Sequence, residues 1–363
     1  MNAITGIGVV SAAGCGAREA ADAARDETVR YGWLTQFEAP EHGPFVAAEI
    51  PPYDLSALVG STKSYLDPSA RHFLAACALA LNDAAPILNG SPRDDVGVGY
   101  GSAFGPLESV RAFADRLADK GARLANPVLF GHTYISTAPS LAAIEWGLRG
   151  PNLTVCAGAA SGLAALAAAA EALEQNGTQA MLAGASDALT EWQYRALAEA
   201  GLTTAASDPE SVPSSPGIVP GEAGVAMLLE PREAARARSA SVRGLLRAVR
   251  VEAGRDGTPP LGAVLGHCLE VQGTEPDVYV SPANGDPFVR ECEAGALAAC
   301  GLDPARCRRL APALVLGETF GAAGALYVAI ACMSLGTGES ALVAAVDRNW
   351  AGAAAVTGGE DRT

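Results

Sequence analysis

The sequence lacks the features that membrane-inserted, secreted and nucleic-acid-binding proteins share. No apolar run reaches the ~18 residues that a membrane-spanning helix needs, and no basic segment precedes an apolar one at the N-terminus. Lysine and arginine are scarce, 25 against 40 aspartate and glutamate, which gives a formal net charge of −15. Such a charge disfavours nucleic acid and anionic membrane as partners. We therefore expect a cytoplasmic protein that binds neither nucleic acid nor a membrane.

The cysteines show no pattern typical of a metal site or of a disulfide framework. There are eight of them in 363 residues, at scattered spacings and without a CxxC pair. We expect them to be reduced small side chains. The sequence predicts no metal ion and no cofactor.

Strands and helices are predicted to alternate along the whole chain. With 49% hydrophobic residues over 363, the chain can bury a sizeable core. Alternation in both halves indicates a layered α/β fold. The strands are predicted near residues 2–11, 153–156, 180–185, 242–252, 277–281, 313–316 and 341–346, and residues 96–105 are predicted to be a strand that enters a glycine loop. The helices are predicted near residues 17–25, 68–81, 107–119, 163–174, 288–300 and 321–335, with a further helix beginning at Pro231.

Residues 150–174 form the most informative stretch of the sequence. A short β-rich run at 153–156 is followed by small residues at 157–162 and then by an alanine- and leucine-rich helix. Many enzymes present a nucleophile on such a strand, turn and helix, because the sharp turn exposes one side chain and the helix N-terminus stabilises negative charge. At the apex of this turn stands Ala159, which has no nucleophilic atom.

This stretch resembles the active site of the β-ketoacyl-ACP synthases, the ketosynthases of the thiolase superfamily. Aligned by Gly150-Pro151 and by Ser161-Gly162 without a gap, the chain places Ala159 at the family's catalytic cysteine. The family's two catalytic histidines correspond to Asn284 and Glu318. The segments that carry this comparison are 283–285, followed by Arg290 and Glu293, and 317–324. Ala313 stands at the family's lysine.

The resemblance covers nearly the whole chain. Further segments similar to the family are residues 4–11, 96–102, 181–187 and 221–230. It implies a thiolase-like layered α-β-α-β-α fold of two similar halves, which we place at residues 1–231 and 232–363.

A ketosynthase frame without the cysteine, the histidines or the lysine resembles the chain-length factors of type II polyketide synthases. These are non-catalytic subunits that pair with an active ketosynthase and shape the polyketide tunnel. The resemblance therefore implies no catalytic residue at Ala159, Asn284 or Glu318. In that family glutamine usually replaces the cysteine, so the alanine is a departure that argues against a part in malonyl decarboxylation.

The resemblance also implies two partners and a lining for the tunnel. The first partner is an active ketosynthase subunit in a heterodimer, and the second is the acyl carrier protein, which is generally acidic and is expected to dock mainly on the ketosynthase. Phe130, Tyr134 and Thr137 lie in the segment that lines the family's acyl channel at the dimer interface, although ordinary core packing explains such residues equally well. A local basic patch could still bind the carrier protein on this chain, although such a run more often forms a solvated helix face. The arginines that could form it are Arg232, Arg236, Arg238, Arg243, Arg247 and Arg250.

Two other functions stay open at this point. One is a decarboxylase or acyltransferase with a rearranged site that uses Cys156, His132 or Glu318. The other is a scaffold that only stabilises its partner. Glu318 could pair with the amide of Asn284 and brace the loops, or could act as an acid if burial raised its pKa. None of the four histidines, His42, His72, His132 and His267, falls at a catalytic position of the family.

Overall fold

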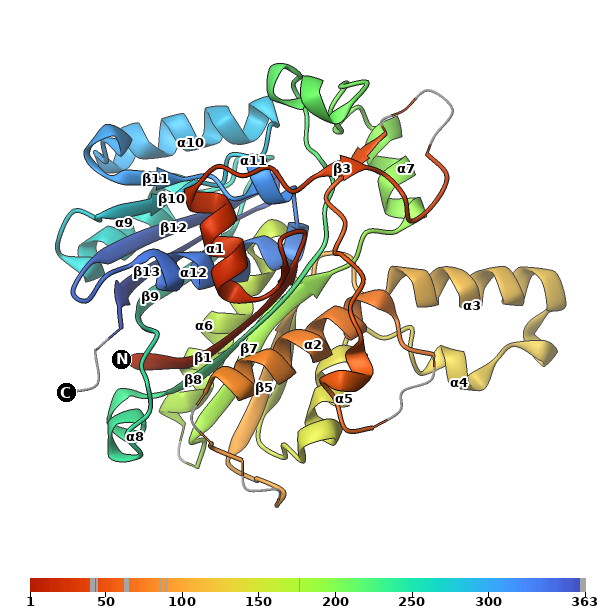
Figure 1. The fold of residues 1–363 in the computed structure, drawn as a ribbon, viewed down its shortest axis with the longest axis horizontal. Helices are drawn as coiled ribbons and strands as arrows, with labels where there is room; N and C mark the ends of the chain where they lie inside the picture. Colours follow the sequence, from red (N-terminus) through yellow and green to blue (C-terminus); the bar gives the residue numbers. More distant parts are fainter. Residues whose placement is uncertain are drawn as a thin grey trace.

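The computed structural model describes residues 1–39, 43, 45–61, 65–84, 86–88, 91–175 and 177–359. Its main feature is an eleven-stranded sheet, and a two-stranded ribbon of β3 (Gly32–Trp33) and β4 (Val46–Ala47) lies apart from it (Figure 1). No helix in the described part of the chain has the length and apolar character needed to cross a bilayer.

The sheet consists of two halves with the same strand order. In the first half the order is β1, β8, β7, β5 and β6, and in the second it is β9, β13, β12, β10 and β11. In each half the first two pairings are antiparallel and the last two parallel. The halves join where β1 pairs with β9, with Asn2 opposite Leu246. The chain therefore folds as two similar halves, as predicted.

The strands have the following bounds. In the first half they are β1 (Asn2–Ser11), β5 (Val96–Gly101), β6 (Asn152–Val155), β7 (Ala180–Asp187) and β8 (Ala223–Pro231), with β2 (Gly14–Cys15) beside β1. In the second half they are β9 (Gly244–Ala253), β10 (Val278–Val280), β11 (Arg308–Leu310), β12 (Ser340–Val346) and β13 (Trp350–Gly358).

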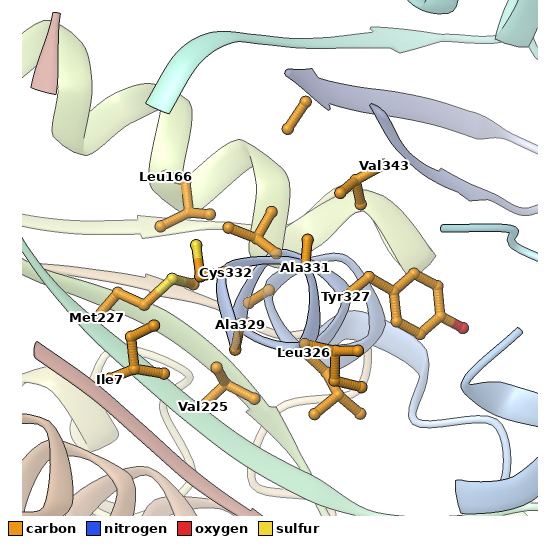
Figure 2. Close-up of a cluster of buried hydrophobic side chains, with 14 of the residues drawn as sticks. Ile7, Leu166, Val225, Met227, Leu326, Tyr327, Ala329, Ala331, Cys332 and Val343 are labelled. Carbon is orange, nitrogen blue, oxygen red and sulfur yellow. The ribbon is translucent and has the colours of Figure 1, made fainter. Parts of the chain in front are cut away.

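Two helices fill the space between the halves of the sheet. They are α6 (Ser161–Glu174) and α12 (Ala323–Ser334). Helix α12 is apolar around most of its circumference, which is typical of a helix with no solvent-facing side. In Figure 2 its side chains meet Ile7 and Val225 of the first half and Val343 of the second.

Helices also cover the outer faces of both halves. Helices α2 (Pro68–Asp83) and α5 (Thr137–Trp146) pack on the first half, and α9 (Leu261–Gln272) and α10 (Pro287–Cys300) cover the second. Each outer layer has its own buried apolar cluster, separate from the cluster between the halves. The result is a thiolase-like α-β-α-β-α fold.

The remaining helices are short or peripheral. They are α1 (Ala17–Arg25), α3 (Leu107–Lys120), α4 (Pro127–Phe130), α7 (Glu191–Glu199), α8 (Arg232–Ala237) and α11 (Ala313–Leu316). In Figure 1, α3 and α4 project from the body of the molecule.

One predicted strand is wrong. Residues 313–316 form the one-turn helix α11, and the neighbouring strand is β11 at Arg308–Leu310. A four-residue apolar run does not distinguish a strand from a buried helical turn. Here Leu316 is buried while Leu314 is exposed, which is a helical pattern of burial. Strands β8 and β13 and helices α5, α7 and α9 were not predicted.

The predicted boundary between the halves falls where β8 ends at Pro231 and α8 begins at Arg232. It stays a prediction, because one continuous sheet crosses from one half to the other.

Candidate functional site

The elbow at Ala159 has the predicted form of strand, turn and helix. Strand β6 ends at Val155, a 3-10 turn covers Gly158–Ala160, and α6 begins at Ser161. The hydroxyl of Ser161 holds the turn, accepting from the amide of Ala157 at 2.8 Å and donating to the carbonyl of Gly158 at 2.7 Å. Gly158 has φ of +51°, which favours glycine.

The apex amide is occupied by a carboxylate from the other half of the chain. The N–H of Ala159 donates to Oδ2 of Asp347, 2.7 Å away. Asp347 follows β12, and its Oδ1 accepts from the amides of Asn349 and Trp350 at 2.7 and 2.8 Å. The two turns therefore hold the carboxylate from both sides.

Asn284 and Glu318, which lie 34 residues apart in the sequence, are in direct contact. The Asn284 side-chain amide donates to Oε2 of Glu318 at 2.6 Å, and the amide N–H of Phe320 donates to Oε1 at 2.6 Å. The two residues are only 9% and 6% exposed. The structure thus brings together the two residues that the resemblance places at the histidine positions, and their hydrogen bond joins the two loops.

Burial raises the pKa of Glu318 to about 7. The negative charges of Asp347 and Asp187 raise it further, whereas the hydrogen bonds from Asn284 and Phe320 lower it. At neutral pH the group is close to half protonated. A carboxyl in this state can donate or accept a proton, but an exchange reaction also needs a substrate beside it.

Asp187 is a central residue that the sequence analysis missed. It ends β7, is fully buried, and accepts from the Ser102 hydroxyl at 2.5 Å and from the amides of Ala103 and Gly321 at 2.9 and 2.7 Å. Burial raises its pKa to about 6. The available signal was the aspartate at the end of the mostly apolar segment MLAGASD, which was predicted to be a strand.

Cys156 and His132, which the rearranged-site alternative would use, are not arranged as a nucleophile and its base. Cys156 is exposed at the end of β6, and partial burial of its thiol raises its pKa, which lowers the thiolate fraction at neutral pH. No hydrogen bond among the described residues joins it to His132, whose Nδ1 has no partner there.

The other histidines lie elsewhere. His72 in α2 contacts Tyr53 and Glu222, and His267 lies in α9. His42 is outside the described residues. Among those residues, no group of three or more histidine, cysteine, aspartate or glutamate side chains is arranged to hold a metal ion.

Phe130 and Tyr134 lie on the surface of the chain, so core packing is the wrong interpretation for these two residues. They are 46% and 52% exposed, with ring centroids 5.3 Å apart. Thr137 begins α5, and its hydroxyl donates to the carbonyl of Gly131 at 2.9 Å. Other exposed apolar side chains of the same region are Val110, Leu117, Leu124, Val128 and Ile144.

A cleft of about 350 Å³ reaches the site from the side of α1 and α11. Asn284, Gly285 and Ala313 line it, together with Tyr31 and Leu314. Ala159 and Glu318 are not among its lining residues. Of Ala159, Asn284 and Glu318, only Asn284 therefore lines this cleft.

The arginine run does not form a free basic patch. Arg238 pairs with Glu230, Arg243 with Asp83 and Arg250 with Glu252. At least three of the six charges are therefore already balanced by carboxylates of the same chain.

Comparisons with known proteins show the family to which this chain belongs. The family model for the β-ketoacyl synthase N-terminal domain matches residues 3–235. The chain belongs to the β-ketoacyl synthase family. It is 31% identical over 356 residues to a Streptomyces halstedii protein assigned as polyketide beta-ketoacyl synthase 2, covering 92% of this chain and 84% of that one. It is 26% identical to the 3-oxoacyl-[acyl-carrier-protein] synthase 2 of Synechocystis over 250 residues, 66% of this chain and 60% of that one.

Solved structures of the family have the same fold. The ishigamide ketosynthase/chain length factor superposes with a TM-score of 0.85 at 18% identity, covering 98% of each chain. A type II polyketide synthase acyl-carrier protein in complex with its ketosynthase bound to the hexaketide gives 0.82 at 16% identity, covering 98% of this chain and 99% of that one. At these identities the likeness is one of fold.

Proposed function

We propose that this β-ketoacyl synthase family member is a non-catalytic chain-length factor. In this proposal it pairs with an active ketosynthase and shapes the tunnel in which a polyketide grows. The observation that carries it is the elbow, which keeps the ketosynthase frame but presents Ala159 at the apex. The names of the relatives support it, since one is a polyketide synthase and one a ketosynthase/chain length factor.

The site supports a structural role for Asn284 and Glu318. Each satisfies the other in a buried position, and a carboxamide has no ionisable proton to shuttle. Their contact holds the loop after β10 to the turn before α12. A general acid or base at the position of Asn284 would have to give up and regain a proton in each catalytic cycle, which a carboxamide cannot do.

The exposed apolar region of α3, α4 and α5 supports an interface with the partner. It adjoins β6, which is the last strand in its half of the sheet and so has an open edge among the described residues. Exposed strand edges and large apolar patches are characteristic of surfaces that pair with another chain. An obligate interface of this kind buries roughly 2,000 Å² or more.

Phe130 and Tyr134 are the side chains that we assign to the tunnel. Aromatic rings at the closed end of an apolar channel stop its contents by occupying volume. Their mutual packing at 5.3 Å gives them a defined position from which to do so. The control of chain length is then steric and needs no bond to this subunit.

Acyl carrier protein is expected to dock mainly on the ketosynthase. This chain carries −15 net charge, and at least three arginines of the run are neutralised within the chain. Carrier proteins are generally acidic, so the electrostatic free energy of docking favours a more basic surface.

The test is co-expression with ketosynthases encoded beside this chain, followed by sizing and native mass measurement. A one-to-one heterodimer that makes polyketide only when both chains are present supports the proposal. A homodimer of this chain alone that turns over malonyl thioester contradicts it.

One observation favours a second candidate, a decarboxylase with a rearranged site. The pKa of Glu318 at about 7 is suited to an acid or base at neutral pH. If this candidate holds, the isolated chain releases carbon dioxide from malonyl thioester and E318Q abolishes the release. If the chain-length factor proposal holds, neither the wild-type chain nor E318Q releases it.

A further inference from the structure

The backbone amides around the elbow are directed at carboxylates of the chain itself. Three of them come from two turns, Gly158–Ala160 before α6 and Phe320–Ala322 before α12, which pack against each other. The amide of Ala159 donates to Asp347 at 2.7 Å, that of Phe320 to Glu318 at 2.6 Å and that of Gly321 to Asp187 at 2.7 Å.

Two of these contacts form a reciprocal pair across the halves. Asp187 ends β7 of the first half and binds the turn before α12, whereas Asp347 follows β12 of the second half and binds the turn before α6. Strands β7 and β12 hold the same place in their halves of the sheet. Each half thus supplies a carboxylate to the turn that begins the other half's central helix.

A free amide at such a turn is a ready anion site. Backbone N–H groups at a helix N-terminus stabilise carboxylates and, in acyl transfer, the oxyanion of the tetrahedral intermediate. At Ala159 an oxygen that carries negative charge already sits at hydrogen-bond distance from the amide. The carboxylate lies so close to the turn that a Cβ on Gly158 would be 1.8 Å from Oδ2 of Asp347.

We propose that Asp347 is an internal occupant of the elbow's anion site. Its carboxylate takes the position where an acyl thioester oxyanion would be stabilised, and its charge disfavours a thiolate at position 159. Two separate features therefore prevent acyl transfer at the elbow. Position 159 has no thiol, and its backbone amide already donates to Asp347. The closure belongs to this chain alone and does not depend on which partner it binds.

The proposal predicts that a restored cysteine is not enough to restore reactivity. In A159C the introduced thiol lies beside the Asp347 carboxylate, which raises the pKa of the thiol and lowers its nucleophilicity at neutral pH. In A159C/D347A the amide is free, the charge is gone and the helix N-terminus favours the thiolate.

The experiment measures alkylation of the introduced thiol by iodoacetamide at pH 7.5, in the full chain. Peptide mass mapping separates the thiol at position 159 from the exposed Cys15 and Cys156, whose rates serve as internal references. We expect at least tenfold faster alkylation in A159C/D347A than in A159C. Rates within a factor of two would overturn the proposal.

The matched control is A159C/D277A. Asp277 lies at the opposite end of β12 and, like Asp347, binds a backbone amide, that of Ser340 at 2.8 Å. Its removal is expected to leave the alkylation rate at position 159 unchanged. A rate increase in this control equal to that of D347A would show general loosening of β12 and would also overturn the proposal.

A second measurement avoids the introduced thiol altogether. Hydrogen exchange of the segment 157–161 is compared in the wild-type chain, D347A and D277A. Faster exchange at the Ala159 amide in D347A alone is expected, because its acceptor is removed. Unchanged exchange in D347A would contradict the assigned contact. Both readouts concern the elbow only, so their outcome is distinct from that of the heterodimer test.

Discussion

The buried carboxyl of Glu318 predicts a specific pH dependence of stability. Its pKa rises from the ordinary 4.5 to about 7 on folding, so the folded chain binds this proton more tightly than the unfolded chain. The stabilisation is complete below pH 4.5 and is lost as the pH rises through 7. A shift of this size corresponds to about 3 kcal/mol of unfolding free energy between those limits.

Replacing Glu318 by glutamine removes the titration and keeps the shape. The glutamine carbonyl can still accept from the Phe320 amide, but its NH₂ then faces the Asn284 amide group, at a cost of about 1 kcal/mol. At pH 5 the wild-type chain has already lost about 1 kcal/mol of this proton-linked stabilisation, so we expect E318Q and the wild-type chain to be about equally stable there. At pH 8 we expect E318Q to be more stable by about 2 kcal/mol.

The assay is urea unfolding of both chains at several pH values from 5 to 8. The difference between the two free energies isolates Glu318, because Asp187 titrates in both. Replacement of the exposed Glu199 by glutamine controls for the substitution itself. A difference between E318Q and the wild-type chain that stays constant over this range would refute the raised pKa and the reasoning from burial.

Three further predictions concern Asp187, the turn at Gly158 and the exposed aromatic pair Phe130 and Tyr134. D187A is expected to lower the unfolding free energy by about 3 kcal/mol or more, because three backbone amides and the buried Ser102 hydroxyl lose their acceptor; an effect below 1 kcal/mol in chemical unfolding would contradict this. G158A is expected to cost about 3 kcal/mol, from its positive φ and the displaced Asp347 carboxylate. G273A also has positive φ but open space around its Cβ, so it should cost only about 1 kcal/mol, and equal losses would show that the carboxylate contact is unimportant. In the complex with a ketosynthase, F130A and Y134A are expected to give longer products at unchanged heterodimer content, and products of unchanged length would favour a pure scaffold.

The reciprocal aspartates also explain why the frame persists around an apex without a nucleophile. Asp187 and Asp347 join strand ends of one half to turns of the other, so they stabilise the fold whether or not a reaction occurs there. The absence of a nucleophile at Ala159 therefore leaves these contacts in place. The shape of the elbow is therefore explained by the packing of the two halves and does not require a catalytic function.

The fold class and the form of the elbow could be predicted from the amino-acid sequence. Strand and helix patterns are local, since apolar periodicity and turn residues act within a few positions, and they placed β1, α3 and α12 correctly. The small residues around Ala159 likewise predicted a tight turn before a helix. The same local rule failed at 313–316, where a four-residue run was too short to show a period.

The contacts between side chains at the site could not be predicted in this way, because they depend on how distant parts of the chain pack together. Ala159 and Asp347 are 188 residues apart, and Glu318 lies 34 residues from Asn284, so no local pattern indicates either contact. They meet because two similar halves pack their central helices against each other, which brings the carboxyl ends of distant strands to adjacent turns. Burial, and with it the raised pKa values of Glu318 and Asp187, is a property of that packing alone.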